Sequence, residues 1–400
     1  MHLSERPPRI LILAGEVSGD DHGARVVDAT RAIRPEIEWV GTGGARLAAA
    51  GVEIWAGLDR LAVMGFAEVV RDLGFFRALE RRVVAALDAR CVDLVLLVDY
   101  PGFNLRIARR ARERGIPVLY YIAPQVWAWK PHRARRLARD ADRIAVILPF
   151  EAPIFEAEGG DVEFVGHPLV EAPRRGGVAG LPSDASGPAG SVSTPLRADL
   201  GVGEETPLLA LLPGSRVHEV ERHLPPFVEA ARRAVRSHPG LVPVIGVAPG
   251  IETGRFAGTG LRTTPRVREL LDTARAALVK SGTSTLEATI AGVPLVTAWR
   301  SSPLTWWLAR RLVRVEHVAL PNLILDRRVV PELLQSEVTG ERLAAALDPL
   351  LSGGREREAI VGGLAEVRAK LGGPGAARRV ATIALELLEK VELRGRRGER

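Results

Sequence analysis

Short apolar runs alternate along the chain with longer stretches in which apolar residues return every three or four positions. Residues 9–15, RILILAG, form an apolar run that ends at a glycine, as expected of a strand buried on both faces. Similar runs follow in IEWVGTG, CVDLVLLVDY, IPVLYYIAP and DRIAVILPF, and helical spacing occurs in FNLRIARRARERG and PHRARRLARDAD. This alternation predicts an α/β fold with a doubly wound parallel sheet.

The pattern is interrupted once and then resumes. Residues 171–195 are rich in Gly, Pro and Ser, which is typical of a flexible linker or a surface insertion. Strand-like runs return in PLLALLPG, LVPVIGVAPG, AALVKSGT and VPLVTAWR. We therefore predict two domains, 1–170 and 201–390, a flexible segment over 171–200 and a basic tail over 391–400. The last helices of the second domain could pack back on the first.

Composition narrows the class of protein. With 400 residues, 46% of them hydrophobic, the chain can bury two cores. The single cysteine excludes an intrachain disulfide, and the eight histidines lack the spacing of a zinc site, so no metal is expected. No long apolar segment or signal peptide is present, which indicates a cytoplasmic protein without a membrane span. The net charge of +7 favours an anionic partner.

Two loops of the second domain have the composition of anion sites. In LLPGSR, Gly214 allows close approach of a ligand, Ser215 supplies a hydroxyl and Arg216 supplies a forked cation where a helix begins. A plain strand-to-helix turn with a surface arginine explains this loop equally well on its own. The other loop also opens a helix after a strand; its residues are Ser281, Gly282, Thr283 and Ser284.

Glu287 lies one turn into the helix that follows the second loop. Its carboxylate could accept hydrogen bonds from the hydroxyls of a sugar, or it could simply favour the positive end of the helix dipole. Two loops of this kind in one domain, with a carboxylate beside one of them, favour a nucleotide diphosphate as ligand. A Walker loop is excluded because no GxxxxGK[ST] occurs.

The first domain has acidic residues after its strands. Glu16, Ser18 and Asp20 follow the first strand, and the lack of GxGxxG there disfavours a nicotinamide-dependent oxidoreductase. Asp99 follows an apolar run, with Asn104 shortly beyond it, and a carboxylate in that position can act as a base toward an alcohol. The alternative for Asp99 is a cap on the following helix or turn.

Two stretches combine apolar, aromatic and basic residues at helical spacing, which is typical of helices at a membrane surface. Ordinary core helices with solvated arginines are the alternative. The candidate membrane-facing residues are Phe66, Val69, Val70, Leu73, Phe76, Trp306 and Trp307.

Nine segments, in order along nearly the whole chain, resemble those of the lipid-A-disaccharide synthase family. They are AGEVSGDDHGA, LAVMGFAEV, VDYPGFNL, APQVWAWK, FVGHPL, LLPGSRVHEVE, SGTSTLE, LPNLI and PELLQ. The resemblance implies a GT-B fold of two Rossmann-like domains that face each other across a cleft. It also implies an inverting glycosyltransferase of the lipid A pathway in Gram-negative envelopes. The donor would be UDP-2,3-diacylglucosamine and the acceptor 2,3-diacylglucosamine 1-phosphate, joined through a β-1,6 link with no cofactor and no metal at the diphosphate.

The same resemblance suggests roles for individual residues. Asp99 matches the family's essential aspartate, the candidate base, and Arg216 its essential arginine at the donor diphosphate. Glu287 and Asn322 would lie near the ribose and uridine. Glu16, Ser18 and Asp20 of the first loop would touch a sugar. Asn104, which lies beyond Asp99, is a further candidate for substrate binding. Some members carry a second acid where this chain has Gly102, so no role of that acid applies here.

The acylated substrates give a reason for peripheral contact with the anionic surface of the inner membrane. Oligomeric state stays open, with a homodimer as one option. One alternative is another GT-B enzyme that acts on UDP-sugars, either a different glycosyltransferase or an epimerase. Another is a basic nucleic-acid-binding protein. Against the latter, the basic residues are dispersed and no known binding motif accompanies them, so we expect no nucleic acid partner.

Overall fold

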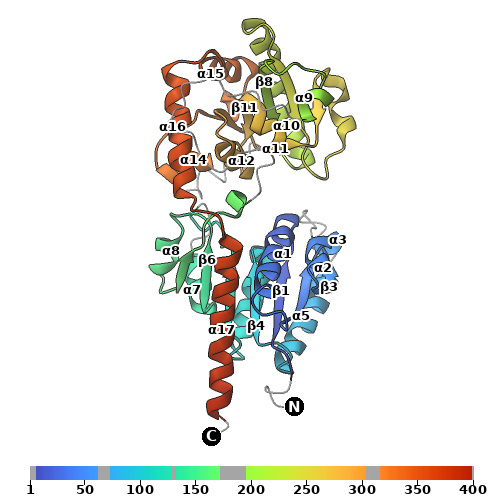
Figure 1. Ribbon diagram of the computed structural model, residues 1–400, viewed down its shortest axis with the longest axis vertical. Coiled ribbons are helices and arrows are strands. Elements are labelled where there is room, and N and C mark those ends of the chain that lie inside the picture. Colours follow the sequence, from blue (N-terminus) through green and yellow to red (C-terminus); the bar gives the residue numbers. More distant parts are fainter. Residues whose placement is uncertain are drawn as a thin grey trace. The chain divides into compact units, whose positions relative to one another are not determined.

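The structure is a computed structural model that describes residues 6–61, 73–127, 132–171, 195–302, 306 and 316–398. The chain divides into two compact units. The first unit contains Met1–Glu171 together with Leu371–Arg400, and the second contains Ala172–Lys370 (Figure 1). Most of the expected linker, residues 172–194, lies outside the described residues.

The first unit is built on a parallel sheet of seven described strands in the order β3-β2-β1-β4-β5-β6-β7. The strands are β1 (Arg9–Ala14), β2 (Glu38–Gly43), β3 (Glu53–Gly57), β4 (Leu94–Val98), β5 (Val118–Tyr121), β6 (Arg143–Val146) and β7 (Val162–Phe164). Alternate residues of β1 enter opposite cores, with Leu11 and Leu13 on one face and Ile10 and Ile12 on the other. This two-residue period explains why the strands appear in the sequence as continuous apolar runs.

Helices cover both faces of this sheet. One face packs against α5 (Leu73–Asp88), α6 (Pro101–Arg112), α7 (His132–Asp140) and α8 (Ala152–Glu156). The other face packs against α1 (Val17–Arg31), α2 (Ala45–Ala49) and α17 (Ala376–Gly398). The short helices α3 (Leu58–Leu61) and η1 (Pro168–Glu171) lie in connections.

The last helix of the chain packs on the first unit. Val380 and Ala384 of α17 are fully buried in the same core as Ile12 of β1, and α17 lies beside α1 and β4 (Figure 1). The second unit therefore ends at Lys370, earlier than the limit of residue 390 expected from the sequence.

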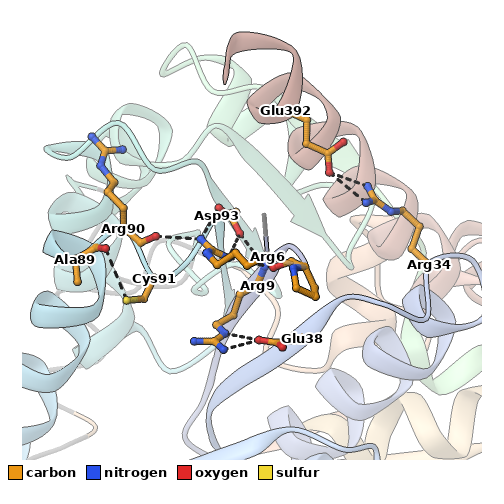
Figure 2. A network of polar contacts seen from close by, with 10 residues as sticks. Arg6, Arg9, Arg34, Glu38, Ala89, Arg90, Cys91, Asp93 and Glu392 are labelled. Carbon is orange, nitrogen blue, oxygen red and sulfur yellow. Dashed lines mark hydrogen bonds and ion pairs between the residues drawn. The ribbon is translucent and has the colours of Figure 1, made fainter. Parts of the chain in front are cut away.

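Ion pairs fasten the amino ends of the strands in the first unit. Asp93, just before β4, accepts hydrogen bonds from the Arg6 guanidinium and from the backbone N–H of Arg9 (Figure 2). At the same edge Arg34 donates to Glu392, which joins the end of α1 to α17. Arg6, Arg9 and Arg34 are thus each paired with an acidic side chain at these strand ends.

The second unit repeats the architecture with a parallel sheet of six described strands, in the order β10-β9-β8-β11-β12-β13. They are β8 (Leu208–Leu212), β9 (Val242–Gly246), β10 (Arg262–Thr264), β11 (Ala274–Lys280), β12 (Leu295–Trp299) and β13 (Glu332–Leu334). One face packs against α10 (Val217–Ser237) and α15 (Gly340–Ser352). The other packs against α9 (Pro195–Asp199), α11 (Val267–Thr273), α12 (Thr283–Ala291) and α16 (Arg355–Lys370), with α14 (Leu320–Leu325) beside α12 and α16. Two 3₁₀ helices, η2 (Thr253–Thr259) and η3 (Gln335–Glu337), complete the unit.

The predicted α/β fold with two doubly wound parallel sheets is confirmed. Strand order reverses between β1 and β4 in the first sheet and between β8 and β11 in the second. In sheets of this type ligands bind in the crevice at the carboxyl ends of those two strands. Among the described residues, no helix is long and apolar enough to cross a membrane.

Candidate active site

Asp99 lies at the point of strand reversal in the first unit, directly after β4. Asp99 and Tyr100 have φ angles of 47° and 50°, a left-handed conformation that costs a non-glycine residue roughly 1–3 kcal/mol. Two side chains hold this turn, because Tyr120 Oη and Asn104 Nδ2 both donate to the Asp99 carbonyl oxygen at 2.7 Å. The backbone that carries the candidate base is therefore fixed by two buried side chains, Tyr120 and Asn104.

Burial and a like charge make the Asp99 carboxyl a weaker acid. Burial raises its pKa, the negative charge of Glu16 raises it further, and the N–H of Tyr100 opposes both, giving a pKa of about 6. Glu16 occupies the position before α1, and β1 and β4 pair in register up to Ala14 and Val98. A carboxyl with a pKa near neutrality is suited to general base catalysis.

Gly15 brings the first loop close to Asp99. A Cβ on Gly15 would lie 2.4 Å from Cγ of Tyr100, so only glycine lets the tyrosine ring pack on this loop. The Tyr100 hydroxyl then donates to the carbonyl of Leu61 at 2.9 Å. The structure thus brings Glu16 close enough to Asp99 for its charge to raise the pKa of that carboxyl.

A second buried carboxyl, Glu151, was not predicted from the sequence as a site residue. It is 1% exposed and accepts hydrogen bonds from the Leu148 N–H at 3.1 Å and from the Trp127 indole at 3.3 Å. Burial raises its pKa to about 7, and the charge of Asp99 adds a smaller rise. The available signal was its place after a strand-like run, in ILPFE.

Two residues that are expected to touch a sugar make hydrogen bonds to the backbone. The Asp20 carboxylate accepts hydrogen bonds from the N–H groups of Gly44, Arg46 and Leu47, so it caps α2. Asn104 is fully buried and its amide donates to backbone carbonyls at the ends of β1 and β4. Both side chains thus hold nearby backbone groups, and their contacts with a substrate stay predictions. Ser18 is exposed in the first turn of α1.

In the second unit the loop Gly214–Ser215–Arg216 lies at the carboxyl end of β8, where α10 begins. Gly214 has a φ of 141°, and a Cβ there would lie 2.6 Å from Cβ of Glu219. The Ser215 N–H donates to Glu219 Oε2 at 3.0 Å, and Arg216 Nη1 lies 3.4 Å from Glu219 Oε1. The Arg216 side chain is 47% exposed, which leaves its guanidinium accessible to an anion.

The second loop opens α12 at the carboxyl end of β11. Gly282, with a φ of 147°, precedes the helix, and Thr283 is exposed in its first turn. Ser281 is buried, and its hydroxyl donates to the Val318 carbonyl at 2.8 Å, so it secures the loop. Burial raises the pKa of Glu287, while a hydrogen bond from the Ser284 hydroxyl and the charge of Arg268 lower it in part.

Asn322 also has a structural role. It is fully buried; its amide donates to the Val330 carbonyl and to Glu332, and its oxygen accepts from the N–H groups of Val329 and Val330. These four bonds use its whole hydrogen-bonding capacity. The nucleotide contact of Asn322 stays a prediction, and in this structure its side chain binds the segment before β13.

Lys280, the last residue of β11, is a cation that the sequence interpretation did not include. Its ammonium donates to Glu219 Oε1 at 2.8 Å. Burial raises the pKa of Glu219, but the hydrogen bond and charge of Lys280, with the Ser215 N–H and the charge of Arg216, outweigh it and lower that pKa. The signal available in the sequence was its position directly before Ser281.

The candidate membrane-facing residues separate into several classes. Phe76 is buried in the core of the first unit and packs on Phe103 at 6.3 Å, so its membrane role is corrected. Leu73 is 40% exposed, and the ring of Trp306 is tilted against that of Trp299, with 5.7 Å between the ring centroids. The remaining candidates lie outside the described residues; they are Phe66, Val69, Val70 and Trp307.

Comparisons with known proteins find one family that matches nearly the whole chain. The sequence model of a family described as lipid-A-disaccharide synthetase matches residues 10–373. The lipid-A-disaccharide synthase of Myxococcus xanthus is 42% identical over 391 residues, which cover 96% of this chain and 98% of the relative.

Solved structures share the fold. MnaA of S. aureus, in a co-structure with UDP, has a TM-score of 0.62 at 12% identity, covering 93% of this chain and 94% of that one. The glycotransferase of kitacinnamycin has a TM-score of 0.58 at 15% identity, covering 96% and 100%.

Proposed function

Because this chain belongs to the lipid-A-disaccharide synthetase family, we propose that it is the glycosyltransferase that joins UDP-2,3-diacylglucosamine to 2,3-diacylglucosamine 1-phosphate. The product is the β-1,6-linked disaccharide 1-phosphate, and UDP is released. One observation carries the proposal: the strand reversals of the two sheets have opposite chemistry, with a carboxyl of raised pKa at one and an exposed arginine at the other.

The first unit acts on the acceptor. Asp99 takes the proton of the acceptor's 6-hydroxyl as that oxygen forms a bond to the anomeric carbon of the donor. The bond from this carbon to the β-phosphate oxygen breaks at the same time, and its electron pair leaves with UDP. Attack on the face opposite to the leaving group inverts the anomeric centre. The negative charge of Glu16 raises the pKa of Asp99 toward neutrality and so makes it a stronger base.

The second unit binds the donor. Gly214, Ser215 and Arg216, with the N–H groups that begin α10 and α12, bind the diphosphate. Arg216 neutralises the charge that grows on UDP in the transition state. The Glu287 carboxylate accepts a hydrogen bond from the ribose. UDP in the MnaA co-structure supports a nucleotide site of this class on the shared fold.

Both lipid substrates require access to a membrane. We therefore propose that the protein is cytoplasmic and binds peripherally to the anionic inner-membrane surface. We further propose that residues 172–194 take no part in the chemistry, whereas 195–199 of the expected linker form α9 in the core of the second unit. The candidates for membrane contact are Phe66, Val69, Val70, Leu73 and Trp307. Exposed arginines on neighbouring helices of the first unit, such as Arg77 on α5, Arg112 on α6 and Arg136 on α7, support attraction to anionic lipid.

The experiment measures UDP release from UDP-2,3-diacylglucosamine in mixed micelles with EDTA, with and without the acceptor, followed by mass analysis of the lipid. We expect release that depends on the acceptor and a tetra-acyl disaccharide phosphate as product. If the folded protein binds UDP but forms no disaccharide, the proposed acceptor is wrong. Turnover of the donor without an acceptor, into a UDP-sugar of the same mass, indicates an epimerase instead.

A further inference from the structure

Lys280 lies where the two loops of the proposed donor site meet. The register of β11 with β8 pairs Val279 with Leu212, so Lys280 comes beside the chain that leaves β8 toward Gly214. A Cβ on Gly282 would lie 3.7 Å from Lys280 Nζ, so the ammonium group also lies beside the backbone at which α12 begins. Lys280 is therefore next to both helix N-termini of the site.

Glu219 holds this cation together with the first loop. It is buried in the first turn of α10, and its Oε1 accepts from Lys280 Nζ at 2.8 Å and lies 3.4 Å from Arg216 Nη1. Its Oε2 accepts from the Ser215 N–H at 3.0 Å. One carboxylate thus fixes two cations and a backbone N–H. The Ser215 N–H and Arg216 follow β8, and Lys280 is the last residue of β11.

The backbone of Glu219 is fixed as well. His223 Nε2 accepts from the N–H of Arg300, so its Nδ1 carries the proton and donates to the Glu219 carbonyl at 2.8 Å. Burial lowers the pKa of His223, which keeps the ring neutral in this arrangement. The carboxylate that holds the two cations therefore lies on a secured turn.

The charges around Glu219 do not cancel. Two cations face a single carboxylate, and the free N–H groups at the starts of α10 and α12 add further positive potential. Lys280 is 18% exposed, and an ammonium group has three donors, of which Glu219 takes one. This local excess of positive charge matches a diphosphate.

We propose that Lys280 is a second cation that binds the donor diphosphate and that Glu219 is a positioning residue for both Lys280 and Arg216. This inference rests on the proposed function. Lys280 keeps its bond to Glu219 and donates a further hydrogen bond to a phosphate oxygen. As the bond between the sugar and the β-phosphate breaks, the electron pair moves to UDP, and Lys280 stabilises the added charge.

The test compares Lys280→Met with the matched control Lys370→Met, a change at an exposed lysine at the end of α16 in the same unit. Calorimetry measures the affinity for UDP and, as a ligand without phosphate, for uridine. We expect Lys280→Met to weaken UDP binding about 10-fold or more and uridine binding less than about 2-fold, because one charge-assisted hydrogen bond is lost. We expect kcat to fall by a similar factor or more, and Lys280→Arg to bind UDP more tightly than Lys280→Met.

A double variant, Lys280→Met with Glu219→Gln, separates ligand binding from a merely structural role. If Lys280 only neutralises Glu219, removing both charges restores UDP affinity to that of Glu219→Gln alone. Our proposal expects the double variant to bind UDP more weakly than Glu219→Gln, though by a smaller factor than Lys280→Met weakens the wild-type protein, because Glu219 no longer positions Lys280.

The failures are distinguishable. If the wild-type protein binds UDP and forms the disaccharide while Lys280→Met behaves as Lys370→Met, the role of Lys280 is wrong and the proposed function stands. Equal weakening of UDP and uridine also contradicts a phosphate contact. If the wild-type protein does not bind UDP at all, the proposed function itself fails.

Discussion

The strand reversals of the two units share a topology and differ in charge. In each unit the order of a parallel sheet reverses between two strands, and the loops after those strands lead into helices. The first unit has Glu16 and Asp99 in those loops. The second unit has Arg216 in the loop after β8 and Lys280 as the last residue of β11. The fold thus supplies the same position twice, while the side chains decide which chemistry each position carries out.

Asp99 and Glu219 show how neighbouring charges set the pKa of a carboxyl that is shielded from solvent. Burial raises the pKa of both carboxyls. Beside Asp99 lies another acid, Glu16, which adds to the rise, whereas Glu219 contacts Lys280 and Arg216, which reverse it. Asp99 is therefore suited to gaining a proton during turnover, and Glu219 stays ionised and holds cations.

The largest expected effect comes from removing the base. Asp99→Asn retains the shape of the side chain but cannot accept the proton of the acceptor, so we expect turnover to fall about 10²–10⁴-fold. UDP release assays measure this, and Asp28→Asn, a change at an exposed acid of α1, is the control. Near-normal turnover of Asp99→Asn would show that another group, such as Glu16, takes the proton.

The corresponding change in the second unit is Arg216→Met. We expect turnover to fall about 10²–10³-fold, because the variant lacks a donor to charge that develops on UDP. The melting temperature should change little, since the side chain is half exposed and exposed ion pairs contribute little to stability. Arg222→Met, at an exposed arginine of the same helix, is the control. If Arg222→Met reduced turnover as strongly, the effect would belong to the net charge of the helix.

The two asparagines of the chain test which polar residues are structural. Asn322→Ala leaves the buried N–H groups of Val329 and Val330 without their acceptor, so we expect a loss of roughly 2–4 kcal/mol in urea unfolding. The turnover of the folded fraction should persist. Asn104→Ala should reduce both stability and turnover, because Asn104 supports the carbonyl of Asp99. Selective loss of UDP binding in folded Asn322→Ala would restore its nucleotide role.

The smallest expected effect is a shift in the pH profile. Asp99 is active when ionised, so kcat/KM should rise with pH through about 6 and level off above it. Glu16→Gln removes a negative charge that raises this pKa, so the rise should move to lower pH by less than about one unit. The acceptor phosphate titrates in the same range, but it is identical in both measurements, so the difference reports on Glu16. A shift to higher pH would contradict the account.

The central strands of the two sheets could be predicted from the sequence, whereas several strands at the sides of the sheets could not. Central strands such as β1 and β4 are buried on both faces and form unbroken apolar runs. The edge strands β3, β10 and β13 have three to five residues and partly exposed side chains, so no such run marks them. The packing of α17 on the first unit was one option from the sequence, but it depends on contacts between residues far apart in the chain, which periodicity alone does not decide.

At the site, the sequence shows which loops carry polar residues after a strand, but not which of these side chains bind backbone groups. A polar residue after a strand has the same pattern whether it binds a substrate or a backbone group. Asp20, Asn104 and Asn322 illustrate this, because their hydrogen bonds go largely to nearby N–H and carbonyl groups. Lys280 and Glu219 were missed for the opposite reason, since their pairing joins β11 to α10 through residues 61 positions apart in the chain.

The most direct test of the division between the two units is a calorimetric titration of UDP into Asp99→Asn and Arg216→Met, beside the wild-type protein. The account predicts that Asp99→Asn binds UDP within about 2-fold of wild type despite its loss of turnover. Arg216→Met should bind UDP about 10-fold or more weakly, because it lacks a charge-assisted contact to the diphosphate. Loss of UDP affinity in Asp99→Asn, or unchanged affinity in Arg216→Met, would contradict the separation of base and donor site.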